Sequence, residues 1–554
     1  MFRRFALSMG CVAACSAVAL TACNNNAPVT VLSTSPADGA TAVPVSAQIT
    51  IQFSRACRRD SLDLGISPDT AAQTTWTQDS QTASIAPEAP LAPGTVYNIV
   101  VRAVSGAGGG NLETLYSSSF TTAASVTTAP ELHLVEVPDA LSPDNPVWSL
   151  PSAPAPGPGD MVENTDFGTT QRRVTATLGL RHEYAKFDPF NASQSLVLLM
   201  YIPDGAWRVY RTASVPYDTA AQLTATVDLE EPRWDPVDPN MLWGTRDFQI
   251  VKVDVRHPGQ PETVKDFAQD STIKPILDAH PDLYHITMNN EGKSSTDKRY
   301  WAFSLQGSQD NYRARYLFTW DRVSDTVPGM HPLPLGQSNI DWVGMSPKGN
   351  WVLIGGLDDN AAPLTGLTMA NRELTQFHRL DFSTAHADVG LDVNGTEVVV
   401  MQNVRTDHVD LIPIDTGTQP IIGIDGSYAG TNRTPLIRLY YAGSDSNGLN
   451  SGIHLSCNHP GYCVVSTAID QGLPAQNWLD RKIVITKLDP THPRTFYLAQ
   501  VYGTRGEYWE ETQATIANNG AKVVWATNWS KDVGQIPERV WDMQTVLPEG
   551  WVIP

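Results

Sequence analysis

Runs of hydrophobic residues alternate with short polar turns along most of this chain. From about residue 180 onward one pattern recurs seven times: a polar or charged residue, a short apolar stretch, a tight turn of Asn, Asp, Gly, Lys or Ser, and a second apolar run. Such turns between two runs of strand-forming residues are typical of β-hairpins. The clearest copies are residues 341–354, 386–401 and 511–525, and the weaker ones are residues 184–200, 231–243, 287–303 and 454–466.

The sevenfold repeat predicts an all-β fold with a C-terminal seven-bladed β-propeller over residues 162–554. The strand before each turn would be the inner strand of a blade, and closure of the ring would remove exposed sheet edges. Residues 172–177 are expected to complete the last blade beside residues 540–546 and so to fasten the ring. An array of β-sandwiches stays open as an alternative, because hairpin turns occur in any all-β fold.

Residues 28–123 form a separate module of short predicted strands divided by turn residues. Three phrases in it, at residues 35–40, 89–97 and 119–122, resemble the bacterial Ig-like domain of the S-layer-protein type. That resemblance covers the whole module and implies an N-terminal β-sandwich that acts as a spacer. Residues 124–161 are predicted to be a linker, since their Pro-rich composition favours an extended chain.

The first residues have the composition of an export signal. Residues 1–22 comprise a basic start, an apolar core and small residues before Cys23, which is the pattern of a signal peptide. Residues 20–23 resemble the lipobox of bacterial lipoproteins. The resemblance implies that Cys23 carries a lipid that anchors the protein to a membrane. Asn24 at the next position implies the outer membrane, with the protein facing the periplasm or the cell surface. An ordinary signal peptide is the alternative.

Charge and cysteine content narrow the possible partners. The net charge of the chain is −20, and the loss of Arg3 and Arg4 with the signal makes it −22. Such a surface repels nucleic acid and anionic lipid, so we expect no nucleic-acid partner. Cys457 and Cys463 flank a tight turn and are predicted to form a disulfide in an oxidising compartment. Cys57 is predicted to be a buried free cysteine.

Candidate site residues follow from the predicted inner strands. In a propeller these strands begin at the mouth of the central channel, where general acid or base groups could reach one substrate. His386, Glu511 and Glu231 each lie nine residues before a turn, and His454 begins the corresponding strand of the sixth unit. The remaining candidates are their sequence neighbours Arg233, Trp234, Asp388, Tyr508 and Gln513.

These residue types suit a sugar ligand. If the site is catalytic, we expect His386 or His454 to remove a proton, Arg233 to clamp a carboxylate and Tyr508 to protonate a leaving oxygen. The aromatic side chains would offer flat apolar faces to the ligand. The residues expected to bind the ligand are Glu231, Trp234, Asp388, Glu511 and Gln513. The alternative for His386 and Asp388 is a structural tie between blades.

Three short phrases, at residues 167–175, 231–234 and 511–529, resemble the propeller of the oligogalacturonate lyase family. That family holds a divalent metal with three histidines and a glutamine, and two of the histidines are one residue apart. This sequence contains no His-x-His pair. We therefore predict no metal site, and the sequence leaves the cofactor open. A looser set from neighbouring blades would have to use His386, His454 and Gln513.

Two functions from different classes remain. The first is a lipid-anchored extracytoplasmic propeller that binds a glycan or a surface protein at its mouth without catalysis. The alternative is a carbohydrate-active enzyme, a lyase that cleaves uronate-containing polysaccharide. Geometry separates them, because catalysis requires several of the candidate side chains to approach one pocket. Those side chains are His386, His454, Arg233, Tyr508 and Glu511.

Overall fold

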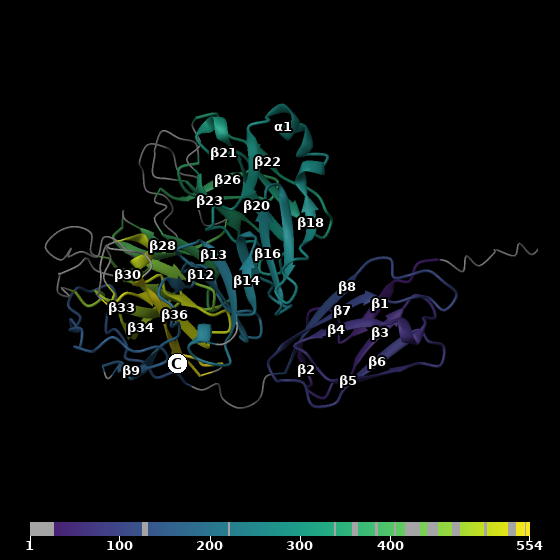
Figure 1. Ribbon diagram of the computed structural model, residues 1–554, viewed down its shortest axis with the longest axis horizontal. Coiled ribbons are helices and arrows are strands. Elements are labelled where there is room, and N and C mark those ends of the chain that lie inside the picture. The colour runs from purple at the N-terminus through teal and green to yellow at the C-terminus, as the bar shows by residue number, and fades with distance from the viewer. Residues whose placement is uncertain are drawn as a thin grey trace, which may run out of the picture. The chain divides into compact units, whose positions relative to one another are not determined.

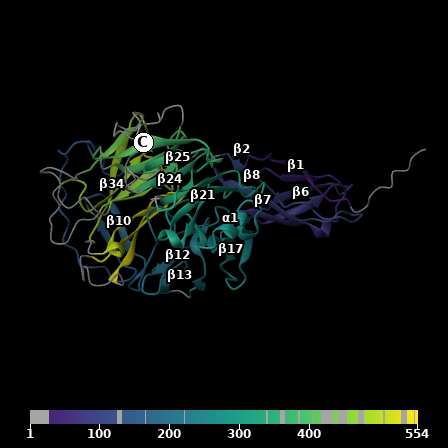
Figure 2. The ribbon, with the colours of Figure 1, turned by 90° about the horizontal axis from the view of Figure 1, so that it is seen from above.

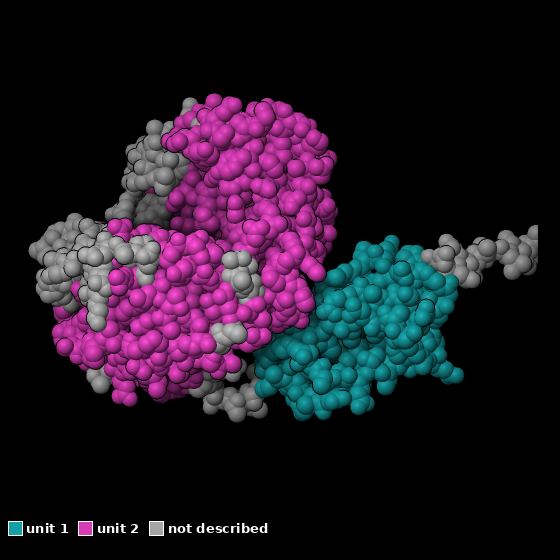
Figure 3. Space-filling view, viewed as in Figure 1, with its two compact units in different colours: residues 1–128 teal, residues 129–554 magenta. Residues whose placement is uncertain are grey.

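The chain divides into two compact units, Met1–Thr128 and Ala129–Pro554 (Figure 3). Both are described here from a computed structural model. The predicted signal and Cys23 lie outside the described residues. The structure describes residues 27–123, 131–164, 166–219, 222–336, 340–356, 364–382, 386–403, 406–415, 433–439, 453–467, 477–503, 507–529, 539–548 and 550–553.

The first unit is a sandwich of two four-stranded sheets (Figure 1). One sheet has the order β1 (Val31–Ser35), β3 (Ile49–Phe53), β6 (Thr82–Pro87) and β5 (Ala72–Trp76). The other has the order β2 (Ala40–Val43), β8 (Tyr116–Thr122), β7 (Val96–Ala103) and β4 (Asp63–Ser67). Alternate residues of β3 and β7 are buried, as expected of strands with one face on a core. Ile51, Ile99 and Phe120 lie in that core.

Within its described residues the second unit contains six sheets, and the nine-stranded one comprises both the first and the last blade, so that seven blades follow one another as the repeat predicted. Blade 1 is β11 (Leu180–Arg181), β12 (Leu196–Tyr201), β13 (Ala206–Arg211) and β14 (Thr224–Val227). Blade 2 is β15 (Glu230–Trp234), β16 (Met241–Arg246), β17 (Gln249–Asp254) and β18 (Glu262–Asp266). Blade 3 is β19 (Leu283–Thr287), β20 (Tyr300–Gly307), β21 (Arg313–Asp321) and β22 (Met330–Pro332).

The next three blades have the same order. Blade 4 is β23 (Ile340–Met345), β24 (Val352–Gly356), β25 (Gly366–Ala370) and β26 (Phe377–Asp381). Blade 5 is β27 (Ala387–Leu391), β28 (Glu397–Asn403), β29 (His408–Pro413) and β30 (Thr434–Arg438). Blade 6 is β31 (His454–Ser456), β32 (Tyr462–Ser466), β33 (Lys482–Lys487) and β34 (Arg494–Gln500). The buried faces of adjacent blades pack on each other through large apolar side chains.

Blade 7 joins the two ends of the propeller sequence. It consists of β35 (Thr515–Ile516), β36 (Lys522–Thr527), β37 (Trp541–Val546), β10 (Thr169–Arg173) and β9 (Met161–Asn164). Arg172 pairs with Gln544 in an antiparallel ladder, so an early strand lies among the C-terminal strands (Figure 2). Leu180 of blade 1 also pairs with Trp541. The predicted fastening of the ring is therefore present, and it leaves neither end of the propeller as a free blade edge.

Helices are few and short among the described residues. The α-helix α1 (Lys274–Ala279) follows blade 2. The 3₁₀ helices are η1 (Arg59–Ser61), η2 (Tyr217–Thr219), η3 (Phe267–Gln269), η4 (Ser308–Asp310) and η5 (Tyr508–Glu510). Within the described ranges, no helix has the length and apolar character needed to cross a membrane.

The predicted linker differs from the structure after residue 130. Residues 131–160 run along the propeller, where Val137 N donates to Thr495 O of β34 (2.8 Å). The Trp148 ring packs on the core between blades 5 and 6. The prolines favour an extended backbone, as predicted, but the apolar residues between them attach that backbone to the blades. Residues 131–160 therefore belong to the second unit.

Candidate functional site

All seven inner strands begin on the same face of the propeller. Each blade is an antiparallel meander, so the chain returns to its starting face before it enters the next blade. We call this the strand-start face. The inner strands are β11, β15, β19, β23, β27, β31 and β35. The beginnings of these strands therefore lie at one end of the ring axis.

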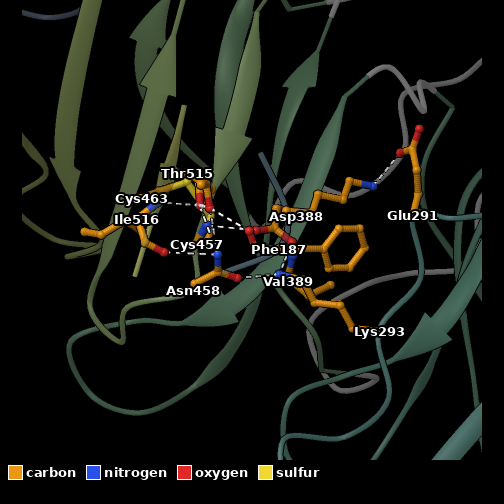
Figure 4. Close-up of polar contacts among 12 residues, drawn as sticks. Phe187, Glu291, Lys293, Asp388, Val389, Cys457, Asn458, Cys463, Thr515 and Ile516 are labelled. Atoms are coloured by element: carbon orange, nitrogen blue, oxygen red, sulfur yellow. Dashed lines mark hydrogen bonds and ion pairs between the residues drawn. A yellow bond between two sulfur atoms is a disulfide. The ribbon is translucent and has the colours of Figure 1, made fainter. Parts of the chain in front are cut away.

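The connection between β19 and β20 reaches across the ring. We call residues 288–294 the channel segment. Lys293 Nζ donates to Asp388 Oδ1 of blade 5 (2.7 Å) and to Asn458 Oδ1 of blade 6 (2.9 Å) (Figure 4). Asp388 is 2% exposed and also accepts from Cys457 N (2.8 Å). The predicted ligand contact at Asp388 is therefore a buried tie between blades.

Glu291 links the channel segment to blade 1. Lys186 Nζ donates to Glu291 Oε2 (2.7 Å) and lies 4.5 Å from the centre of the Trp342 ring. Burial opposes ionisation of Glu291, but Lys186 outweighs it and holds the pKa of that carboxyl below its usual range. Burial together with the charge of Glu291 raises the pKa of Asp341, at the start of blade 4, to about 6. Carboxylates from two blades thus face the same ammonium group.

Glu231 anchors the other end of the channel segment. Its side chain accepts from Thr287 Oγ1 (3.0 Å), Met288 N (3.1 Å) and Asn290 N (2.5 Å). The residue is 4% exposed and has a φ of 51°, which a non-glycine residue rarely adopts. Glu231 was predicted from the hairpin pattern to bind the ligand. In the structure its carboxylate is occupied by backbone and hydroxyl donors of blade 3.

Arg233 is held between a carboxylate and an aromatic ring. Its Nη1 donates to Glu183 Oε2 (2.7 Å), and the guanidinium lies 3.3 Å from the centre of the Phe187 ring. It also donates to Asn290 O (3.3 Å). Burial raises the pKa of Glu183 to about 7 even though Arg233 opposes that rise. A carboxyl group that titrates near neutrality beside the channel is a candidate functional group.

The two predicted histidines stack on each other. The rings of His386 and His454 are 4.4 Å apart at 20°. His386 Nδ1 donates to Ile453 O, and since a carbonyl only accepts, Nε2 carries the lone pair. His454 Nε2 donates to Glu511 Oε2 (2.6 Å). Burial and the neighbouring His454 lower the pKa of His386, which favours its neutral imidazole.

Two tyrosines complete this side of the channel. The Tyr184 ring packs edge-on against His454, with 5.2 Å between ring centres. Tyr508, in η5 before blade 7, is 49% exposed. Partial burial and the nearby carboxylates of Glu291 and Glu511 raise the pKa of Tyr508. Burial raises the pKa of Tyr184 as well, with Glu291 the next cause. The Glu291 carboxylate therefore raises the pKa of both the Tyr184 and the Tyr508 hydroxyl groups.

Two further predicted ligand residues belong to the packing between blades. Trp234 is 8% exposed, and its Nε1 donates to Pro189 O (2.8 Å). Gln513 is fully buried, and its Oε1 accepts from Arg181 Nη2 (2.6 Å). Neither side chain lies at a surface that a ligand could approach directly. Both contacts join neighbouring blades of the ring.

Cys457 and Cys463 form a disulfide, with their Cα atoms 4.2 Å apart. The bridge spans the turn between β31 and β32, beside Asn458 and the backbone that bonds Asp388 (Figure 4). Cys57 is a buried free cysteine of the first unit. The bridge therefore stiffens a turn that contacts the channel segment through Asn458.

Side chains from all seven blades thus meet around one end of the channel, and we call them the rim cluster. Its members are Glu183, Tyr184, Lys186, Arg233, Glu291, Asp341, His386, His454, Tyr508 and Glu511. Among the described residues, no group of three His, Cys, Asp or Glu is arranged to hold a metal ion. A surface cleft lined by Ser195, Arg211 and Arg256 lies away from this cluster, on the outer part of blades 1 and 2.

Sequence reasoning missed half of the rim cluster. Tyr184 and Asp341 begin two of the seven hairpin copies, so the rule that selected His386 would also have selected them. Glu291 and Lys186 carry no comparable signal, because they follow an inner-strand start at no fixed spacing. Their position depends on how the channel segment crosses the ring.

Comparison with known proteins supports the two-part architecture. Residues 25–122 match the family model of the bacterial Ig-like domain, which agrees with the sandwich of the first unit. No curated protein matches the sequence.

The similar solved structures are distant and match only part of this chain. An oligogalacturonate lyase from Vibrio parahaemolyticus is 10% identical and has a TM-score of 0.44. The similarity covers 71% of this chain and 97% of that protein. An oligogalacturonate lyase in complex with manganese is 12% identical and has a TM-score of 0.45. The similarity covers 70% of this chain and 96% of that protein. A TolB-like protein from Agrobacterium tumefaciens is 12% identical and has a TM-score of 0.25. The similarity covers 45% of this chain and 81% of that protein. The seven-bladed fold rests on the strand pairing itself, and these distant similarities assign no activity.

Proposed function

We propose that the rim cluster binds a glycan at the mouth of the propeller without cleaving it. The observation that carries this proposal is the convergence of titratable and aromatic side chains from every blade, which include the half-exposed Tyr508 ring. Aromatic faces beside hydrogen-bonding groups suit a sugar ring, whose faces are apolar and whose edge carries hydroxyl groups. The first unit serves as a spacer between the propeller and its attachment.

The charge arrangement favours a glycan without acidic groups. Lys186 is paired with Glu291, and Arg233 is paired with Glu183, both at 2.7 Å. Lys293 is paired with Asp388 at the same distance. A ligand carboxylate would have to displace one of these protein carboxylates in a partly buried site, which is costly. Neutral sugar hydroxyls can instead bond to the exposed edges of the existing pairs.

One observation favours the second candidate, a uronate lyase. The neutral imidazole of His386 directs Nδ1 at Ile453 O and leaves Nε2 as an acceptor. Such a group could remove the proton on the carbon next to a uronate carboxylate, whereupon the bond to the leaving oxygen breaks and a carbon–carbon double bond forms. The binding proposal is preferred because the cations that should neutralise the substrate, Arg233 and Lys186, are already neutralised by the protein.

The test uses the mature chain with Cys23→Ser and a panel of neutral and acidic oligosaccharides, measured by calorimetry. Tyr508→Ala should weaken binding of the best neutral ligand about fivefold to tenfold, because aromatic contacts contribute about 1 kcal/mol. Val546→Ala is the matched control, since Val546 is 64% exposed at the end of β37 on the opposite face. Equal affinities of the Tyr508 variant and wild type would refute the proposal.

The same preparation separates binding from lyase activity. Formation of an unsaturated uronate, seen by its ultraviolet absorbance, should not occur with any acidic polysaccharide. If the unsaturated uronate does form, and if His386→Gln abolishes its formation without unfolding the protein, the lyase hypothesis replaces the binding hypothesis. His454→Ala is unsuitable for this test, since His454 is 1% exposed and bonded to Glu511.

We also propose that a lipid on Cys23 anchors the protein to the outer membrane, facing the periplasm or the cell surface. The support is the signal-like composition of residues 1–22 followed by cysteine. Cys23→Ser should move the protein from the membrane fraction to the soluble fraction. Unchanged partitioning of that variant would contradict the anchor.

A further inference from the structure

We propose that Tyr284, His285 and Tyr312 of blade 3 form an outer glycan subsite that stacks a neutral pyranose ring. We call these residues the tyrosine platform. The inference rests on the proposed glycan binding at the rim cluster and extends it, because it requires a ligand that is a chain of several sugars. It also names the class of sugar, one without carboxylate or sulfate groups.

The platform is an exposed aromatic surface on an otherwise polar edge. Tyr284 is 38% exposed and Tyr312 is 59% exposed. Their rings are perpendicular, with centres 5.6 Å apart, and the His285 ring stacks on Tyr284 at 4.1 Å. Rings held in fixed positions by each other lose little freedom when a ligand binds. Clustered exposed aromatic residues of this kind mark interaction sites more than isolated apolar residues do.

The backbone at Tyr312 places its ring at the surface. Asn311 and Tyr312 have φ values of 53° and 62°, in the left-handed region that a bulky side chain rarely adopts. The turn is closed by Tyr312 N, which donates to Gly307 O (3.2 Å). Packing into a core does not account for this conformation, because most of the Tyr312 side chain is in solvent. The hydrogen-bonded turn accounts for the conformation and leaves the Tyr312 ring exposed.

Polar groups lie beside the platform. Gln306 Oε1 accepts from the Tyr284 hydroxyl (2.8 Å) and from His285 Nε2 (2.8 Å). Glu230 lies 3.4 Å from His285 Nδ1 and has a side chain that is 58% exposed. Its carboxylate can accept bonds from hydroxyl groups, whereas it would repel an acidic sugar.

Continuous contacts join the platform to the rim cluster. Gln306 Nε2 donates to Asn289 Oδ1 (3.0 Å), and Asn289 Nδ2 donates to Asp341 O (2.8 Å). Tyr284 follows the first residue of β19, and Tyr312 precedes β21. Both positions are on the strand-start face, where the rim cluster also lies. An oligosaccharide seated at the rim can therefore extend outward over blade 3.

The experiment compares short and long neutral ligands on the mature chain with Cys23→Ser. The probes are disaccharides and hexasaccharides of β-1,4-linked glucose, mannose and xylose, measured by calorimetry. Tyr312→Ala should weaken hexasaccharide binding about fivefold to tenfold and leave disaccharide binding within twofold. Tyr312→Phe should retain the wild-type affinity, since stacking needs the ring and not the hydroxyl. Val323→Ala is the control, because Val323 is 65% exposed beyond the other end of β21.

The outcomes separate the platform from the rim. Loss of hexasaccharide affinity in Tyr508→Ala but not in Tyr312→Ala overturns the platform and keeps the rim proposal. Loss in Tyr312→Ala but not in Tyr508→Ala keeps the platform and overturns the rim proposal. Absence of binding by wild type to every hexasaccharide overturns both. Loss in Tyr312→Phe equal to that in Tyr312→Ala also overturns the stacking role.

Discussion

The two units of this protein bury different kinds of side chain. Among residues 27–123, the buried polar side chains are Ser118 and Thr122, and the core is otherwise apolar. The propeller instead buries many titratable groups, among them Arg181, His182, Lys186, Glu231, Asp388, His454, Glu511 and Asp542. A sandwich needs only two apolar faces, whereas a ring of inner strands meets at an axis that apolar blade faces do not fill.

This difference shows where chemistry can arise in the molecule. Charged side chains near the axis must be paired, because an unpaired buried charge is costly. Some of the pairs, such as His182 with Asp542, are fully buried ties between blades. Others, such as Lys186 with Glu291, have one partner 28% exposed and could contact a ligand. The exposure of the side chains separates the two groups of ion pairs.

The largest effect is expected from Asp542→Ala. Asp542 accepts from His182 N (2.6 Å) and contacts His182 Nδ1 (2.9 Å), with both side chains fully buried. Removal of the carboxylate should lower the free energy of unfolding of the propeller by about 3 to 5 kcal/mol. Hydrogen exchange in the full chain should show faster exchange in β11 and β37 and no change in β3. Asp542→Asn, which keeps an acceptor, should cost less. Equal stability of wild type and Asp542→Ala would contradict the tie.

Ile51→Ala tests the apolar core of the other unit. Ile51 is fully buried between the two sheets, and its truncation should cost about 3 kcal/mol. Protection should fall in β3 and β7 while β11 and β37 keep wild-type exchange rates. A comparable loss of protection in the propeller strands would show that the two units do not unfold separately.

Asp341→Asn should give a smaller effect whose sign depends on pH. The pKa of Asp341 is raised to about 6 by burial and by Glu291, so the folded state retains a proton that the unfolded state loses near pH 4. Stability contributed by this group therefore falls as pH rises from 4 to 6 and stays low above. The variant should gain about 1 to 2 kcal/mol over wild type at pH 8 and less at pH 5. Urea unfolding of wild type and variant at pH 5 and pH 8 measures this difference in stability. A larger gain at pH 5 than at pH 8 would contradict the prediction.

Tyr508→Ala should have the smallest effect on stability. The side chain is 49% exposed, so the free energy of unfolding should change by less than about 0.5 kcal/mol. Thermal unfolding of wild type, Tyr508→Ala and the Val546→Ala control should superimpose. A marked destabilisation would place Tyr508 among the structural ties and not among the ligand-binding residues.

Much of the architecture could be predicted from local pattern. Hairpin turns such as Asn394-Gly395 specify two strands within a few residues, so the seven repeats and their order were readable. The strand-start rule also brought His386, His454 and Glu511 together correctly, because inner strands of equal direction must begin on one face. The rule did not distinguish these residues from Glu231, whose carboxylate accepts hydrogen bonds from backbone N–H groups of the next blade.

By itself the sequence determined the all-β class, the seven-unit repeat, the separate N-terminal module and the turn that the Cys457–Cys463 disulfide spans. Each of these depends on residues that are near one another along the chain. Only the tertiary structure decided which charges pair, as with Lys186 and Glu291, and that residues 131–160 attach to the blades. These contacts join residues far apart in sequence, and their partners are set by closure of the ring and by the path of the channel segment, for which local periodicity carries no signal.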